Sequence, residues 1–456
     1  MAPHPRPARS DYRAMLRHRQ AKTWLDRYLP RNRVTPSLRY LTASAEERRK
    51  ATELELAAVA AAYYEPDILT SLLDNSTHGW YPLTFLALSD VVRGGPRFVR
   101  VDRIPRLRTA ASQTINTAAD FERIKGTNAW TELGFQCLSD FMLVAQRIEL
   151  VDSLHPDSVG RHICVDSKQR RYTTGVKAAI LYMMRLRRRK ATYSALAQDF
   201  DMSSTCASST FRYVAISIVD KFGGMLHDEN IVRYVSMAPL WNTAIKTLFM
   251  ERSGLNYVSS IVEPAWAILD GVFQETTRPG KDFTDFQRYM YDGHEKRHGF
   301  HYYNVTAPNG IVIAMRGPWL GKNNDMSIIS KGELDQHTSA IKDASGRRLK
   351  LLCDAIFPAN HYLAPMSREA AAVNRPRREL KGEKACRAGV EHIFSILCND
   401  YPYLYDLYKH RRNTLPQFHW KAATIIMNMR TALYGNTVSK RFKLQPFGLD
   451  RLCEGY

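Results

Sequence analysis

The sequence predicts a chain in two parts, a mostly helical region with a helix-turn-helix followed by an α/β domain built on a mixed sheet. Three observations predict this organisation. Apolar residues recur at helical spacing between about residues 118 and 250. From about residue 255, short apolar runs typical of strands replace them. The chain also carries a formal net charge of +20, which favours a polyanionic partner.

The composition indicates a globular protein with an excess of basic residues. The chain has 456 residues, 45% of them apolar, which is enough to bury substantial cores. The excess of basic residues favours DNA, RNA or an anionic surface, with a merely solvated basic face as the alternative. No run reaches the roughly 18 apolar residues needed to cross a bilayer, so no membrane partner is expected. Seven cysteines without any CxxC pair fit a reduced intracellular compartment.

Four segments are expected along the chain. Residues 1–117 form a basic N-terminal arm and a helical region, and residues 118–250 form a helical DNA-binding region. Residues 251–435 form the α/β domain, and residues 436–456 form a C-terminal tail. Pro/Arg-rich composition in the first segment predicts a flexible arm.

Helices are expected to begin at Thr117 and to cover residues 133–150 and 174–187. A basic run follows the last of these and is expected to contact phosphates; it comprises Arg187, Arg188, Arg189 and Lys190.

Two further helices, over residues 192–200 and 205–222, are separated by a tight polar turn. This pattern predicts a helix-turn-helix, with an ordinary helical hairpin as the alternative. Small hydroxyl residues and one arginine would line the exposed start of the second helix and contact DNA: Ser203, Ser204, Thr205, Ser208, Ser209 and Arg212.

The second half of the chain predicts a mixed sheet. Strands are expected over residues 265–269, 300–306, 311–316 and 349–353, the middle two joined as a hairpin by a Pro-Asn-Gly turn. Gly317-Pro318 is expected to end the third strand. Helices are expected from about Asp325 to residue 341 and over residues 383–399. The order of strand, hairpin, helix, strand and helix matches a ribonuclease-H-like arrangement.

Three acidic residues are expected to converge on this sheet. Asp270 ends the first strand, Asp354 ends the fourth, and Glu391 lies in the last helix. Arg387 is one helical turn before Glu391, where it can pair with that carboxylate or contact a phosphate. Carboxylate oxygens suit Mg²⁺ or Mn²⁺, and a pair of such ions can activate a nucleophile and stabilise a leaving oxygen. The alternative is that these acids are separate caps or surface residues.

Several sequence blocks follow one another in order across residues 260–435: LDGV at 269–272, YDGHEKRHG at 291–299, GPWLGKNND at 317–325, LCDAIFP at 352–358 and RAGVEHIF at 387–394. Together these blocks resemble those of DDE transposases of the PIF/Harbinger type. Val272, Asn324 and Cys353 depart from the usual threonine, histidine and glycine of that family. None of these departures removes an acidic residue.

The resemblance implies metal-dependent cleavage and transfer of DNA strands by Asp270, Asp354 and Glu391, with two Mg²⁺ or Mn²⁺ ions. Asp325 is a fourth acid that either assists the metals or takes the role of the second acid, and the sequence leaves that choice open. A basic, aromatic segment with His294, Lys296, Arg297 and His298 is expected to face the DNA.

The same segment also matches the HExxH pattern of zinc proteases, from His294 to His298. That mechanism needs both histidines on one face of a helix. Gly293 and Gly299 bracket the match and strand-like aromatic residues follow it, so the zinc site is not expected.

The family resemblance further implies a nuclear protein that acts on double-stranded DNA, at transposon terminal inverted repeats and a target site. A homodimer is expected because two ends must be held together, and a Myb-like accessory protein is a possible partner. A domesticated DNA-binding protein or nuclease without transposition activity is the alternative.

Overall fold

The computed structural model describes residues 114–456 apart from 153, 156, 158, 167–170, 189–191, 279–283, 324–333, 344, 367–374 and 406–415. The chain divides into two units, one of residues 1–107 with 279–290 and one of residues 108–278 with 291–456. In the first unit only helix α13 (Thr284–Met290) is described. The expected N-terminal arm and the position of Asp325 lie outside the described residues. No helix of the described part is long and apolar enough to span a bilayer.

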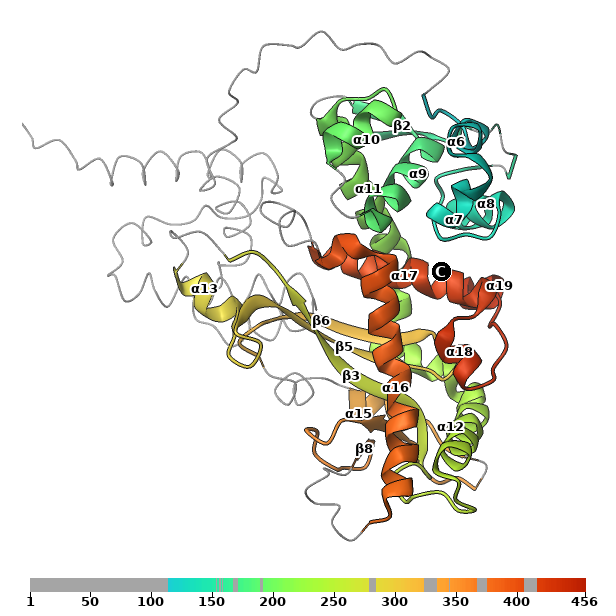
Figure 1. Cartoon of the computed structure of the whole chain (residues 1–456), viewed down its shortest axis with the longest axis vertical. Coiled ribbons are helices and arrows are strands. Elements are labelled where there is room, and N and C mark those ends of the chain that lie inside the picture. The colour runs from blue at the N-terminus through green and yellow to red at the C-terminus, as the bar shows by residue number, and fades with distance from the viewer. Residues whose placement is uncertain are drawn as a thin grey trace, which may run out of the picture. The chain divides into compact units, whose positions relative to one another are not determined.

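The helical part of the second unit begins where the sequence predicts (Figure 1). Thr117 caps α6 (Ala118–Lys125): its hydroxyl accepts a hydrogen bond from the Asp120 amide, and Asp120 bonds back to the Thr117 amide. This reciprocal pairing satisfies two amides that the first helical turn leaves open. Short elements follow: η2 (Gly126–Asn128), α7 (Ala129–Glu132) and α8 (Leu138–Arg147). The apolar run 133–150 is thus only partly helical, because Gly134 turns the chain with a φ of +87°.

A two-stranded antiparallel sheet, β1 (His162–Asp166) with β2 (Arg171–Thr174), leads into α9 (Gly175–Arg187). Thr174 caps α9, as expected for a helix over residues 174–187.

Two capped helices joined by a tight turn follow, in agreement with the sequence. Thr192 caps α10 (Tyr193–Asp199), and Ser203 caps α11 (Ser204–Phe222). The apolar face of α11 is buried at every expected position: Phe211, Val214, Ile218 and Phe222. Helix α11 packs against α9, α10 and α17 (Pro416–Tyr434), which anchors the pair in the core.

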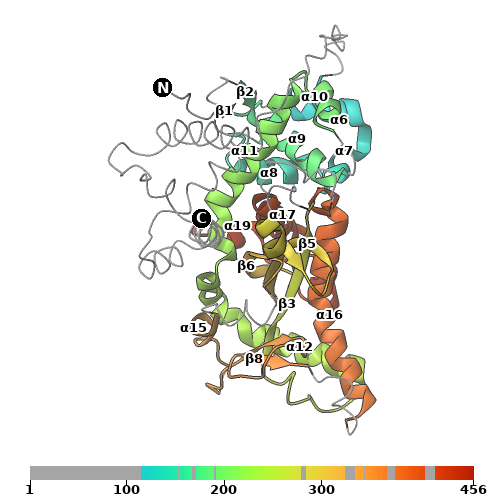
Figure 2. The ribbon, with the colours of Figure 1, turned by 90° about the vertical axis from the view of Figure 1, so that its left-hand side faces the viewer.

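Two 3₁₀ segments, η3 (Gly223–Leu226) and η4 (Asp228–Met237), connect α11 to α12 (Ala238–Ser253). Helix α12 packs on the sheet through β3 and along α16 (Arg377–Asp400). Both helices contact β3, and Figure 2 shows them beside the sheet.

The mixed sheet expected from the sequence is present. Its central strand is β3 (Ala265–Glu275), which pairs antiparallel with β5 (Arg297–Thr306) and parallel with β7 (Lys350–Cys353). Beyond β7 lies the parallel strand β8 (Leu363–Pro365), and β5 also pairs antiparallel with β6 (Val312–Leu320) and with the short β4 (Tyr291–Asp292). In sheet order the path is β4-β5-β3-β7-β8, with β6 attached to β5.

Two strand ends differ from the sequence prediction. Strand β3 continues five residues past Asp270 to Glu275, because its antiparallel pairing with β5 extends from Ile268 to Glu275. Strand β6 is not ended by Gly317-Pro318; it continues to Leu320. A shift in its register with β5 between His301 and Tyr303 accommodates the proline, which has no amide proton to donate to the ladder.

The remaining helices are α15 (Leu334–Thr338), η6 (Pro402–Tyr405), α18 (Thr437–Arg441) and α19 (Leu449–Cys453). Helix α16 begins earlier than the predicted residue 383. Val390, Ile393 and Leu397 of its expected apolar stripe are buried, while Phe394 is half-buried. Gly382 allows α16 to approach α12 closely, since a Cβ there would lie 2.7 Å from Phe249 Cδ2.

Candidate active site

The pairing of β3 with β7 places two aspartates at the same level of the sheet. Ile268 and Leu352 are partners in the parallel register, and Asp270 and Asp354 each follow two residues later. Side chains two residues apart along a strand share a face, so both aspartates leave the sheet on the face of Ile268. Asp354 follows β7 directly, whereas Asp270 lies inside β3 at the point where the pairing with β7 stops.

Helix α16 covers this face and supplies the third acid. Gly389 allows the close approach, because a Cβ there would lie 3.0 Å from Ile268 Cδ1. Arg387 and Glu391 lie one turn apart on α16, the spacing at which helical side chains meet.

One guanidinium joins all three carboxylates. Arg387 Nη1 lies 3.2 Å from Asp270 Oδ2 and 3.2 Å from Asp354 Oδ2. Arg387 Nη2 donates to Glu391 Oε1. The structure therefore brings together the three acids singled out from the sequence, here termed the acid cluster (Asp270, Asp354 and Glu391), with Arg387 at their centre.

The acid cluster opens to solvent on one side. The Asp270 side chain is 16% exposed and Arg387 is 20% exposed, whereas Asp354 and Glu391 are 42% and 50% exposed. Asp270 is further fixed by the Gly271 amide, which donates to its Oδ1 over 2.9 Å. A cation or a phosphate can therefore approach from the side of Asp354 and Glu391 while Asp270 stays anchored to the sheet.

Cys353 lies next to the acid cluster but takes no part in it as a charged group. Burial raises the pKa of its thiol to about 12, and the negative charges of Asp354 and Asp270 act in the same direction. A thiol with a raised pKa is a poor nucleophile at neutral pH.

The donor set fits a hard divalent cation, although Arg387 pairs with all three carboxylates in this structure. The cluster offers carboxylate oxygens, the ligands that Mg²⁺ and Mn²⁺ prefer. Within the described ranges no three acidic, histidine or cysteine side chains are arranged as around a metal. Arg387 holds the position between the carboxylates, so a divalent ion would have to displace its guanidinium.

A buried amide beside the cluster was not identified from the sequence. Asn304 on β5 is the direct cross-strand partner of Asp270 and is fully buried. Neither its Nδ2 nor its Oδ1 has a hydrogen-bond partner among the described residues. Leaving a buried polar group unpaired costs about 1–3 kcal/mol. Only the register of β3 with β5 reveals this neighbour, and a single sequence does not specify that register.

The segment that matches HExxH forms a β-hairpin rather than a helix. His294 and Lys296 lie in the exposed turn between β4 and β5, and His298 lies on β5 opposite Tyr291. The two histidines thus do not share a helical face, which excludes the zinc-protease geometry. Arg297 Nη1 bonds Glu275 Oε2 over 2.8 Å. Partial burial and the charge of Arg278 lower the pKa of His298, which makes its imidazole harder to protonate.

Two arginines of the basic run, Arg187 and Arg188, form hydrogen bonds and ion pairs with other residues of the protein. Arg187 Nε donates to the Glu132 carbonyl over 2.7 Å, and Arg188 Nη2 lies 3.2 Å from Glu132 Oε2. Arg188 also faces Asp199 at 3.8 Å. Arg189 and Lys190 lie outside the described residues. These pairings compete with the phosphate contacts that the sequence predicts for Arg187 and Arg188.

The start of α11 presents a different surface. Ser204, Thr205 and Arg212 are exposed and Ser208 is half-buried, whereas the Ser203 hydroxyl accepts from the Cys206 amide over 3.0 Å as the helix cap. Ser209 is also half-buried. Of the six residues expected to contact DNA, Ser203 therefore caps the helix, and the other five have exposed or half-buried side chains.

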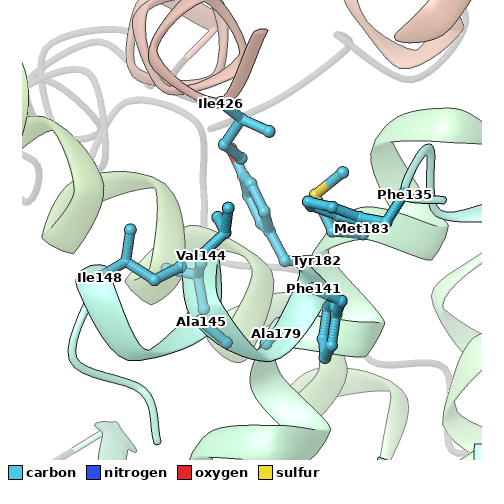
Figure 3. A pocket seen from close by; sticks show the side chains of 10 residues that line it. Phe135, Phe141, Val144, Ala145, Ile148, Ala179, Tyr182, Met183 and Ile426 are labelled. Atoms are coloured by element: carbon cyan, nitrogen blue, oxygen red, sulfur yellow. The ribbon is translucent and has the colours of Figure 1, made fainter. Parts of the chain in front are cut away.

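A small cavity in the helical part does not resemble a substrate site. Figure 3 shows its lining, which is apolar except for the Tyr182 hydroxyl and includes Phe141, Val144 and Ile426. Burial raises the pKa of Tyr182 well above its usual value. The cavity lacks the charged groups that a phosphate ligand requires.

Comparison with known proteins gives one family match, which covers the acid cluster. Residues 269–429 match the protein family described as DDE superfamily endonuclease. The matched segment contains the acid cluster and Arg387, and the match suggests a transposase-like nuclease. It also supports a ribonuclease-H-like fold, in agreement with the mixed sheet. No curated protein and no solved structure matches the chain.

Replacing Arg387 by methionine tests whether the guanidinium and a cation share one position. The ion-free variant is expected to be less stable by about 1–3 kcal/mol, because the carboxylates lose their common partner. Addition of Mn²⁺ should raise its melting temperature more than that of the wild type, since nothing competes with the ion. Differential scanning fluorimetry with and without Mn²⁺ measures both effects.

The matched control is Arg347→Met. Arg347 also joins two carboxylates, Glu263 at 2.7 Å and Asp343 at 3.0 Å, away from the acid cluster. It should respond to Mn²⁺ like the wild type. An equal Mn²⁺ response in all three proteins would contradict the shared position.

Proposed function

We propose that this protein is a DDE transposase of the PIF/Harbinger type, which cleaves and joins DNA strands at its acid cluster. The observation that carries the proposal is the convergence of Asp270, Asp354 and Glu391 around Arg387, on one face of a mixed sheet. The ordered motifs around these residues support the Harbinger subtype, and the net charge of +20 supports a DNA substrate.

Each member of the site has a distinct role in this proposal. Asp270, anchored in the middle of the sheet, Asp354 and Glu391 would hold the divalent ions, which would activate the attacking oxygen and stabilise the leaving oxygen. Asp325, which lies outside the described residues, is proposed as an assisting acid. Arg387 offsets the negative charge of the acid cluster, and its planar guanidinium is also suited to a phosphate of the DNA.

DNA recognition is proposed for the α10–α11 pair. Two helices with a tight turn and an exposed N-terminal end on the second helix fit the geometry of a helix-turn-helix. Thr205, Ser208 and Arg212 can contact DNA from that end, and the turn residues His294 and Lys296 can add contacts near the hairpin. The protein is proposed to act in the nucleus as a homodimer, with Mg²⁺ as cofactor and with a Myb-like accessory protein.

A non-catalytic, domesticated DNA-binding protein is the second candidate. The observation that favours it is the pairing of every acid in the cluster with Arg387, so that a group of the protein itself offsets part of their negative charge. Both candidates predict DNA binding, and only the first predicts ion-dependent nicking.

Substitution of Asp354 by asparagine is expected to reduce Mg²⁺-dependent nicking of DNA carrying the terminal repeats by about 10²–10³-fold or more, because an ion ligand is lost. DNA affinity measured in the absence of divalent ions should change little. Glu275→Gln, an acid on the same β3 strand outside the cluster, is the control and should retain nicking. Undiminished nicking by the Asp354 variant refutes the transposase proposal, and a wild type that binds DNA without nicking supports the domesticated alternative.

Salt-dependent binding tests the proposed role of α11. Arg212→Gln is expected to weaken DNA binding and to lower the slope of log affinity against log salt by about one phosphate contact. Arg188→Gln is the control, because its guanidinium already bonds Glu132 and Asp199. Fluorescence anisotropy over a salt series measures the slopes. A larger effect of the Arg188 variant would place the DNA contact on the basic run instead.

A further inference from the structure

Asn304 stands at a defined place beside the acid cluster. In the antiparallel register of β3 and β5 it is directly opposite Asp270. Residues that oppose each other in this way have side chains on the same face, with Cβ atoms about 4.5–5.5 Å apart. On its other side, Asn304 opposes Met315 of β6, which has no hydrogen to donate and only a weak sulfur acceptor. Asp270 is therefore the strong hydrogen-bonding side chain next to Asn304 across the ladders.

The side-chain amide of Asn304 has no hydrogen-bond partner in the part of the chain that the structure describes. It is fully buried, and neither of its polar atoms forms a hydrogen bond with any described residue. Buried amides in folded proteins are nearly always bonded, so one that is not suggests a second arrangement in which it is. The two oxygens of Asp270 are meanwhile taken up by the Gly271 amide and by Arg387.

We propose that Asn304 is a positioning residue, whose amide donates to the Asp270 carboxylate when that carboxylate holds a divalent ion. This inference rests on the proposed function of the acid cluster. If an ion took the place of the Arg387 guanidinium, Asp270 would lose that hydrogen-bond donor, and Asn304 lies opposite Asp270 where its amide could replace it. Carboxylates that ligate metals are usually held by such outer hydrogen bonds. A neutral amide serves well here, since it orients an anionic ligand without competing with the ion for charge.

The test compares Asn304→Leu with Thr306→Val. Leucine has nearly the shape of asparagine but cannot form hydrogen bonds. Thr306 is an apt control because it lies two residues along the same strand, is fully buried, and also has a hydroxyl without a partner among the described residues. It opposes Ile268 rather than Asp270.

Mn²⁺ binding to the full-length protein, measured by electron paramagnetic resonance of free Mn²⁺, is the readout. The Asn304→Leu variant is expected to bind Mn²⁺ about 10–100-fold more weakly than the wild type. Its melting temperature without ions should be unchanged or higher, because the amide has no bond to lose. Thr306→Val should bind Mn²⁺ like the wild type. Asn304→Ala removes the same amide without overfilling the site and should show the same loss of affinity.

The possible failures are distinguishable. If the wild type binds Mn²⁺ through Asp270, as shown by loss of binding in Asp270→Asn, and both Asn304 variants bind equally well, the positioning role is wrong while the proposed function stands. Equal weakening by Thr306→Val would indicate a general packing effect and would also overturn the inference. If Asp270→Asn binds Mn²⁺ like the wild type, the proposed function fails together with the inference.

Discussion

The arrangement of the candidate active site depends on one interaction, the contact of the Arg387 guanidinium with the three carboxylates of the acid cluster. Three negative charges drawn from β3, from the end of β7 and from α16 would repel one another without a cation between them. Arg387 supplies that charge from the same helix as Glu391. The contact therefore links the helix to two neighbouring strands and keeps the acids close together, a geometry that a metal-dependent nuclease also needs.

Backbone features bring these groups within reach of one another. The parallel register of β3 with β7 sets the two aspartates side by side, and Gly389 lets α16 lie close to Ile268. The antiparallel side of β3 brings Asn304 next to Asp270. Strand β3 thus places Asp270, the proposed ion ligand, directly opposite Asn304, the side chain proposed to orient it. We interpret the site as one with two states, held by an arginine before ions bind and by outer hydrogen bonds afterwards.

Local patterns in the sequence were sufficient to predict the elements that contain the acid cluster. A strand-end aspartate such as Asp354, and Arg387 one turn before Glu391, are properties of short segments, and the structure agrees with both. The length of β3 and the passage of β6 through Pro318 could not be predicted, because pairing with β5 decides them. The ion pair of Arg188 with Glu132 could not be predicted either. The two residues are far apart in the sequence, and a run of basic residues does not indicate which acid each one will contact.

The central claim is that a divalent ion and the guanidinium of Arg387 occupy the same place among three carboxylates. A crystal structure of the protein soaked with Mn²⁺, with anomalous diffraction data at the manganese edge, tests this most directly. Our account predicts an anomalous peak between Asp270, Asp354 and Glu391, with the Arg387 side chain turned away from them. Manganese bound only elsewhere, with Arg387 still joining the three carboxylates, would contradict it.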